Sequence, residues 1–154
     1  MNIWVFFDID GVLTDGYIYI NSEGQETKRY RLTEIDALND IKRHGYRIAA
    51  ITGEDTPIVD CFKRIVKWDY FESGCKDKLS SLKRIAENNG LIPKDICYIG
   101  DGKYDIEAVR YAGLGVCPQN AIQDVKEVAD VILEGYGGQT CVYELFKLLT
   151  DGDN

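Results

Sequence analysis

The sequence predicts an α/β protein built on an open, doubly wound parallel sheet. Short runs of continuous apolar residues are typical of strands that are buried on both faces. Between these runs, apolar residues recur every three or four positions, as in amphipathic helices. Because parallel strands need crossover connections, this alternation indicates a parallel sheet with helices on both faces. At 154 residues the chain has the length of one ordinary domain. We expect a single domain over residues 1–150 and a polar tail at 151–154.

The predicted elements follow one another along the chain. The apolar runs predict strands at residues 3–7, 47–51, 96–99, 114–117 and 131–133. Helices are predicted where the helical spacing occurs, at positions 35, 38 and 41, at 58, 62 and 65, at 79, 82 and 85, and at 106, 109 and 112. We also expect a short strand between the second and third of these helices, and a last helix at residues 139–149.

Residues 16–31 interrupt the alternation. Tyr17-Ile18-Tyr19-Ile20 has strand character, a Ser22-Glu23-Gly24 turn follows, and residues 25–31 mix polar and aromatic side chains. This pattern predicts a β-hairpin after the first strand. Its aromatic face would be exposed on a small monomer, which favours association with another molecule. The alternative is an edge hairpin that lies on its own domain.

Charge and composition exclude several partners. The 26 acidic and 18 basic residues give a net charge of -8, which repels nucleic acid backbones and anionic membrane surfaces. We therefore expect no nucleic acid and no membrane as partner. No run approaches the roughly 20 apolar residues of a membrane span, and no basic leader precedes the first strand, so we expect a cytoplasmic protein. The five cysteines lack a C-x-x-C spacing and are interpreted as reduced thiols.

Oxygen-bearing side chains follow the predicted strands. Asp8 and Asp10 follow the first strand, Thr52 the second and Asp101 the third, and Lys78 opens a helix. In a doubly wound sheet the carboxyl ends of the strands line the ligand crevice, so these groups should converge. Clustered carboxylates repel one another unless a cation lies among them, and oxygen donors without imidazole or thiolate suit Mg²⁺. The sequence therefore predicts a Mg²⁺ site that takes a phosphorylated ligand.

Each of these residues has a structural interpretation when it is taken singly. Aspartates and glycines after a strand are ordinary turn formers. Thr52-Gly53 could cap a helix, and Lys78 could be a solvated lysine. The chemical interpretation depends on the ordered set.

Four motifs make up that set. Residues 8–16 read D-I-D-G-V-L-T-D-G, residues 51–53 read I-T-G, residues 74–78 read G-C-K-D-K, and residues 100–105 read G-D-G-K-Y-D. In this order and spacing they resemble the four motifs of the haloacid dehalogenase superfamily of phosphatases, over about residues 3–117. The resemblance implies a Rossmann-like fold and a Mg²⁺-dependent phosphatase.

The resemblance also implies roles for the two aspartates of the first motif. Asp8 would attack phosphorus and form an aspartyl-phosphate. Asp10 would protonate the leaving alkoxide and then deprotonate the water that releases phosphate. The backbone carbonyl of Asp10 would bind the metal.

The remaining motif residues would surround the phosphoryl group. By the same resemblance, Thr52, Gly53 and Lys78 bind the phosphoryl oxygens, and Asp101 joins Asp8 as a metal ligand. Asp105 could bind the metal, act through Lys78 or a bound water, or cap the helix that follows it.

The segments between the motifs leave no room for a cap domain, which most superfamily members carry. The whole pattern resembles the capless 3-deoxy-octulosonate 8-phosphate phosphatases and the related nonulosonate 9-phosphate phosphatases. This resemblance implies a phosphorylated sugar acid as substrate. It also implies a homotetramer in which the hairpin of one subunit lies near the site of its neighbour. Lys28, Arg29 and Arg31 could contact the carboxylate of such a sugar acid, or they could simply be solvated.

The sequence departs from the group at several positions. Residues 33–37 read T-E-I-D-A where many members have R-D-G-x-G, and Gly102 replaces the second aspartate of a common G-D-D. Glu54 stands where octulosonate phosphatases often have arginine and nonulosonate-type members have an acidic residue. Glu54 and Lys76 are our candidates for the substrate pocket.

Three other functions stay open at this stage. The chain could be a phosphatase of the same superfamily for another small sugar phosphate. Receiver domains also place aspartates, a threonine and a lysine at strand ends, although their acidic pair is adjacent rather than D-x-D. A catalytically silent binding protein would be expected to lack Asp8 or Asp10, and both are present.

Overall fold

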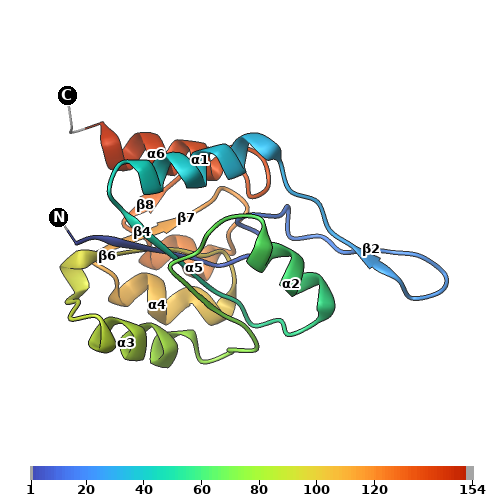
Figure 1. The fold of residues 1–154 in the computed structure, drawn as a ribbon, viewed down its shortest axis with the longest axis horizontal. Coiled ribbons are helices and arrows are strands. Elements are labelled where there is room, and N and C mark those ends of the chain that lie inside the picture. Colours follow the sequence, from blue (N-terminus) through green and yellow to red (C-terminus); the bar gives the residue numbers. More distant parts are fainter. Residues whose placement is uncertain (1, 152–154) are drawn as a thin grey trace.

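The structure, a computed structural model, describes residues 2–151 and contains a parallel sheet covered by helices (Figure 1). The strand order is β5-β4-β1-β6-β7-β8, and every neighbouring pair is parallel. The strands of this sheet are β1 (Trp4–Phe7), β4 (Arg47–Ile51), β5 (Tyr70–Glu72), β6 (Ile96–Ile99), β7 (Leu114–Cys117) and β8 (Val131–Ile132). The predicted α/β class and parallel sheet are confirmed.

Helices cover both faces of the sheet. They are α1 (Leu32–Arg43), α2 (Pro57–Arg64), α3 (Lys78–Asn88), α4 (Ile106–Tyr111), α5 (Gln123–Val128) and α6 (Cys141–Thr150), with 3-10 turns at η1 (Pro93–Asp95) and η2 (Lys103–Asp105). Figure 1 shows α1 and α6 together on one side of the sheet and α3 and α4 on the other. Among the described residues, no helix combines the length and apolar character that a membrane crossing needs.

The central strand β1 has side chains in both halves of the core. Val5 and Phe7 pack with residues of α1 and α6, whereas Trp4 and Phe6 pack with residues of α3, α4 and α5. All four side chains are buried. Burial on both faces explains why the strand reads as a continuous apolar run rather than an alternating one.

The element boundaries differ from the predicted ones by one or two residues. The first strand begins at Trp4, and the last strand ends at Ile132. The last helix runs from Cys141 to Thr150 rather than over residues 139–149. The six-residue helix α5 was not predicted, because a helix of less than two turns carries too little periodicity to be recognised.

The predicted hairpin is present and extends away from the sheet (Figure 1). Its antiparallel strands, β2 (Tyr19–Ile20) and β3 (Glu26–Thr27), are shorter than the sequence suggested. The side chain of Asn21 organises the turn, since its Oδ1 accepts the N–H groups of Glu23 and Gln25. Between β1 and β4 the chain forms this hairpin and α1, without an inserted cap domain in that described segment.

Candidate active site

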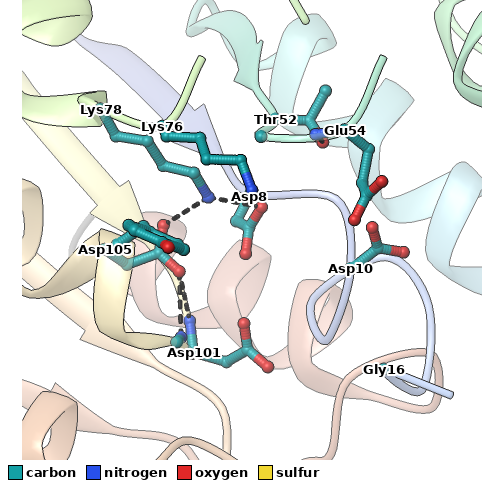
Figure 2. Close-up of a pocket in the computed structure, with 12 residues that line it drawn as sticks. Asp8, Asp10, Gly16, Thr52, Glu54, Lys76, Lys78, Asp101 and Asp105 are labelled. Carbon is teal, nitrogen blue, oxygen red and sulfur yellow. Dashed lines mark hydrogen bonds and ion pairs between the residues drawn. The ribbon is translucent and has the colours of Figure 1, made fainter. Parts of the chain in front are cut away.

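A pocket of about 240 Å³ lies at the carboxyl ends of the central strands (Figure 2). The motif residues that were assigned a role and the pocket candidates Glu54 and Lys76 all line it: Asp8, Asp10, Thr52, Gly53, Glu54, Lys76, Lys78, Asp101 and Asp105. The basic residues Lys28, Arg29 and Arg31 are not among the lining residues. Gly16, Gly102 and Tyr104 complete the lining.

The strand order brings these side chains together. β1 lies between β4 and β6, and Phe7 pairs with Ala50 on one side and with Ile99 on the other. Asp8, which directly follows β1, therefore lies between Thr52, which follows β4, and the turn that follows β6. In addition, the N–H of Asp8 donates to the carbonyl of Ile99, which ties the start of the first loop to β6.

Lys78 enters the pocket from the first turn of α3. Asp77 caps this helix, because its carboxylate accepts the N–H and the hydroxyl of Ser80. The Nζ atom of Lys78 lies 2.8 Å from Oδ1 of Asp8 and 2.9 Å from Oδ1 of Asp105 (Figure 2). The lysine side chain is only 4% exposed, so the solvated interpretation of Lys78 was wrong.

Asp105 supports its neighbours through both carboxylate oxygens. Oδ1 accepts the ammonium of Lys78 and the hydroxyl of Tyr98, at 2.9 and 2.7 Å. Oδ2 accepts the backbone N–H groups of Asp101 and Gly102, both at 3.0 Å. Because four donors already contact this carboxylate, we infer that Asp105 orients Lys78 and the loop of Asp101 rather than serving as the main metal ligand.

Burial and mutual repulsion govern the ionisation of the cluster. Burial raises the pKa of Asp8 well above its ordinary value, the charges of Asp105 and Asp101 raise it further, and Lys78 opposes them. Burial, followed by the charge of Asp105, raises the pKa of Asp101 to about 6. Burial alone would lower the pKa of Lys78, but the charges of Asp8 and Asp105 outweigh it and raise this pKa.

The donor set fits a hard divalent cation. Carboxylate oxygens of Asp8, Asp101 and Asp105 all lie within 4.8 Å of one another. Lys78 supplies one positive charge against these three carboxylates, which leaves an excess of negative charge in a largely buried place. An all-oxygen site with this excess suits an ion such as Mg²⁺ better than metals that prefer nitrogen or sulfur ligands.

Gly11 allows the first loop to pass close to Asp101. Its φ angle is +84°, a backbone conformation that residues other than glycine rarely adopt. A Cβ atom at this position would lie 1.7 Å from Oδ2 of Asp101. Asn120 reaches the same place from a distant loop. Its Nδ2 donates to the carbonyl of Gly11 at 3.0 Å and to Oδ2 of Asp101 at 3.4 Å, and its Oδ1 accepts the N–H of Gly137.

The carboxylate of Asp10 contacts the hairpin. Nζ of Lys28 lies 2.8 Å from Oδ1 and 3.0 Å from Oδ2 of Asp10. The Lys28 side chain is 4% exposed, so the interpretation of the basic cluster as solvated was wrong for this residue. Arg29 contacts Asp15, and Arg31 donates to the carbonyl of Gln139.

Thr52 and Lys76 lie on adjoining loops. Thr52 is 1% exposed, and its Oγ1 accepts the N–H of Glu54. The carbonyls of Thr52 and Glu54 accept N–H groups of Cys75 and Gly74, which fixes the loop that leads to Lys76. In Figure 2 Lys76 points into the pocket from the side of Lys78, whereas Glu54 and Asp10 lie across from it. Thr52 is not a helix cap, because α2 begins after Thr56.

Sequence reasoning missed Tyr98 and Asn120, and it considered Lys28 only as a contact of the substrate carboxylate or as a solvated lysine. Tyr98 lies inside an apolar strand and is fully buried, so only its hydroxyl distinguished it from the other core residues. A buried tyrosine needs a hydrogen-bond partner, which was the available signal. Asn120 follows Pro118 in a segment that reads as an ordinary turn.

The departure at residues 33–37 does not reach the pocket. This segment lies in the first half of α1, and none of its residues is among those that line the site. Glu34 is 1% exposed, and its carboxylate accepts the N–H groups of Val142 and Tyr143 at the start of α6. The segment therefore joins α1 to α6.

Comparison with known proteins bears on the family. A sequence profile of the haloacid dehalogenase-like hydrolases matches residues 67–136. The 3-deoxy-D-manno-octulosonate 8-phosphate phosphatase of Escherichia coli K12 is 26% identical over 145 residues, which cover 94% of this chain and 77% of that protein. A phosphoglycolate phosphatase from Methanopyrus kandleri is 43% identical over 77 residues, covering 50% of this chain and 33% of that protein.

A solved structure extends this likeness over nearly the whole chain. The 3-deoxy-D-manno-octulosonate 8-phosphate phosphatase of Moraxella catarrhalis superimposes with a TM-score of 0.91 at 33% identity, covering 97% of this chain and 86% of that one. Its crystal structure is described as a complex with a magnesium ion, a phosphate ion and a KDO molecule. The chain belongs to the haloacid dehalogenase-like hydrolases, within the capless group of phosphatases that contains the 3-deoxy-D-manno-octulosonate 8-phosphate phosphatases.

Proposed function

We propose that this phosphatase hydrolyses the phosphate monoester of a 3-deoxy ulosonate sugar acid, with Asp8 as the nucleophile. The observation that carries the proposal is the convergence of Asp8, Lys78 and Asp101 in one pocket, with Lys78 held 2.8 Å from Asp8. The likeness to the Moraxella catarrhalis protein, whose structure contains KDO and phosphate, supports the class of substrate.

The reaction proceeds in two displacements. In the first, a carboxylate oxygen of Asp8 attacks phosphorus, the ester P–O bond breaks, and the leaving oxygen takes a proton from Asp10 to form the alcohol. In the second, water attacks the aspartyl-phosphate and gives a proton to Asp10. The bond between phosphorus and Asp8 breaks, and inorganic phosphate leaves. Asp8 and Asp10 thereby return to their starting states.

Charge stabilisation accompanies both steps. We assign contacts with the phosphoryl oxygens to Lys78, to the Thr52 hydroxyl and to the N–H of Gly53, since all three residues line the pocket. Asp8, Asp101 and the backbone carbonyl of Asp10 would hold Mg²⁺. When bound, this ion would offset the negative charge of the acidic cluster and of the phosphoryl group.

The mouth of the pocket offers a site for the acid group of the substrate. Nζ of Lys76 lies 5.4 Å and Nζ of Lys103 lies 5.0 Å from the centroid of the Tyr104 ring. The other basic candidates, Lys28, Arg29 and Arg31, already contact protein oxygens. We assign the substrate carboxylate to Lys76 and Tyr104, and hydroxyl groups of the sugar to Glu54.

A phosphate-release screen tests the proposal. It covers eight- and nine-carbon 3-deoxy ulosonate phosphates, neutral sugar phosphates and phosphoglycolate, each with Mg²⁺ and with a chelator. We expect Mg²⁺-dependent turnover, highest for an ulosonate phosphate, that Asp8→Asn abolishes while Asp60→Asn, at an exposed position of α2, preserves it. Retention of most activity by Asp8→Asn would remove Asp8 from the mechanism.

The same screen separates the competing functions. A receiver-like domain would hold its phosphoryl group and show no sustained phosphate release. A preference for phosphoglycolate or for a neutral sugar phosphate would agree with phosphatase activity but contradict a sugar acid as the substrate. In Lys76→Met we expect KM to rise about tenfold for the ulosonate phosphate and little for a neutral sugar phosphate, since one charged contact is lost.

We further propose that the chain works as a homotetramer. The segment that enters the hairpin carries exposed apolar side chains, with Tyr17 at 71%, Ile18 at 49% and Ile20 at 64% exposure. Several exposed large apolar side chains on one short segment favour contact with another molecule. In the proposed assembly a second copy covers this hairpin and thereby closes the pocket of its neighbour.

A further inference from the structure

Lys28 joins the hairpin to the active site. It follows β3, and its side chain is 4% exposed although Glu26 and Thr27 are exposed and the Arg29 side chain is 68% exposed. Its ammonium contacts both carboxylate oxygens of Asp10, at 2.8 and 3.0 Å. A lysine that is buried while its neighbours remain in water is held by a specific partner, because burying an unpaired ammonium is costly.

The backbone on each side of this contact is fixed. Thr14 pairs with Tyr30 across the base of the hairpin, and Tyr30 packs edge-on against Phe62 of α2 at 5.9 Å between ring centroids. The Thr14 hydroxyl accepts the N–H groups of Gly11 and Gly16 and lies 3.4 Å from Oδ1 of Asp10. The loop that carries Asp10 and the segment after β3 that carries Lys28 are therefore tied together.

We propose that Lys28 is a positioning residue that holds the carboxylate of Asp10 in reach of the leaving oxygen. This inference rests on the proposed function, in which Asp10 transfers the proton. The Asp10 side chain is 31% exposed. Among the described residues, its carboxylate would keep only the long hydrogen bond from the Thr14 hydroxyl, at 3.4 Å, if Lys28 were removed. The contact of Lys28 with both oxygens restrains this carboxylate from the side of the hairpin, and Asp10 also lines the pocket.

The arrangement makes proton transfer depend on the hairpin. Lys28 lies 18 residues beyond Asp10, and the outer hairpin between them is exposed. Displacement of the returning strand would withdraw Lys28 and release the Asp10 carboxylate, whereas the contact of Lys78 with Asp8 comes from a different element. The hairpin thus acts on protonation of the leaving group and leaves the nucleophile in place.

The test compares leaving groups in Lys28→Met, which keeps the length of the side chain and removes its charge. First-turnover rates are measured by rapid quench for a sugar phosphate and for p-nitrophenyl phosphate, whose phenolate leaves without a proton. In Lys28→Met we expect the first-turnover rate to fall about tenfold or more with the sugar phosphate and less than about threefold with p-nitrophenyl phosphate. KM should be nearly unchanged for both substrates. Lys28→Arg should restore part of the loss. Arg29→Met is the matched control, because Arg29 is the next residue along the chain but pairs with Asp15, and it should leave both rates unchanged.

Each outcome bears on the inference. Equal losses for the two substrates would show that Lys28 only maintains the fold, and no loss for either would show that Asp10 needs no such support. The ratio of the two rates is independent of the folded fraction, so a less stable variant remains informative. If wild-type protein shows no Mg²⁺-dependent turnover of either substrate, the proposed function fails and the inference fails with it. If the wild-type protein is active and Lys28→Met has the same ratio of the two rates as wild type, the inference fails and the proposed function stands.

Discussion

The Nζ atom of Lys78 lies 2.8 Å from Oδ1 of Asp8, and neither side chain is more than 9% exposed. The same atom lies 2.9 Å from Asp105, whose side chain is 1% exposed. One buried cation therefore compensates two buried carboxylates. Removing it would leave both carboxylates buried without a compensating positive charge, although Asp105 would keep hydrogen bonds from Tyr98, Asp101 and Gly102. An uncompensated buried charge is among the most unfavourable results of a single substitution.

Lys78→Met should therefore unfold more easily as well as lose activity. We expect a loss of about 3–5 kcal/mol in the free energy of unfolding, measured in chelator by urea titration. Lys63→Met is the control, because Lys63 is an exposed lysine of α2, and it should change stability by less than about 0.5 kcal/mol. Similar stabilities of the two variants would mean that water screens the Lys78 contacts far more than their burial indicates.

The acidic cluster predicts that stability without metal falls as pH rises. The pKa of Asp101 is about 6 in the folded protein, above the value of about 3.9 expected in the unfolded chain. Between these values the folded state binds more protons, so the contribution of Asp101 is fully present below about pH 4 and is lost as pH rises through about 6.

Asp101→Asn isolates this effect. In chelator we expect the variant to match wild type near about pH 4 and to be roughly 2–3 kcal/mol more stable near about pH 8, since one pKa unit corresponds to about 1.4 kcal/mol. Mg²⁺ should stabilise wild type at the higher pH and have little effect on the variant. Glu87→Gln, at an exposed position of α3, should show no such pH-dependent difference. A constant difference between Asp101→Asn and wild type at all pH values would contradict the assigned ionisation.

The central part of the fold was predictable because its strands are buried on both faces. Trp4–Phe7, Arg47–Ile51 and Ile96–Ile99 are almost uninterrupted apolar runs, and such runs admit few other structures at that length. The ends of elements were less certain, since the residues that end a helix depend on tertiary contacts. Helix α6, for example, begins where Glu34 accepts the N–H groups of Val142 and Tyr143, a contact across 108 and 109 residues.

The site was predictable in its residues but not in its supporting contacts. Residues that follow parallel strands must meet at one edge of the sheet, so Asp8, Thr52 and Asp101 could be grouped from sequence. No local pattern, however, connects Lys28 to Asp10 or Asn120 to Gly11, because the paths of the hairpin and of a distant loop determine these contacts. Sequence spacing alone left Lys28 in a basic cluster that could contact a sugar-acid carboxylate or be solvated.

The exposed hairpin predicts a change of assembly on substitution. Ile18→Glu combined with Ile20→Glu places charge on side chains that are 49% and 64% exposed in the single chain. If another copy covers these side chains, each substitution removes about 1.5–3 kcal/mol of favourable burial from the association free energy, and the oligomer should dissociate. Light scattering at micromolar concentration should give several times the 17.4 kDa chain mass for wild type and a smaller mass for the variant.

Ile92→Glu is the matched control for that experiment. Ile92 is 50% exposed and lies beside η1, at a distance from the hairpin along the chain. It should leave the mass unchanged. A wild-type protein that scatters as a monomer would contradict the tetramer, and a variant that keeps the wild-type mass would place the contact elsewhere.

Alanine substitutions at two glycines with the same backbone conformation distinguish the effect of backbone strain from that of a steric clash at the metal site. Gly11 and Gly24 have φ angles of +84° and +80°, so an alanine at either position costs about 1–2 kcal/mol of backbone strain. At Gly24 the added Cβ meets nothing within 4 Å, whereas at Gly11 it would lie 1.7 Å from Oδ2 of Asp101. Gly11→Ala must therefore displace the Asp101 carboxylate or its own loop.

Because a misplacement of about 1 Å can lower a rate about 100-fold, we expect Gly11→Ala to lower the rate of phosphate release at least that much and to weaken Mg²⁺ binding measured by calorimetry. Gly24→Ala should lose stability only through the backbone strain and keep its activity. If the two variants retained equal activity, the close approach of Gly11 to Asp101 would have no part in holding the metal ligand.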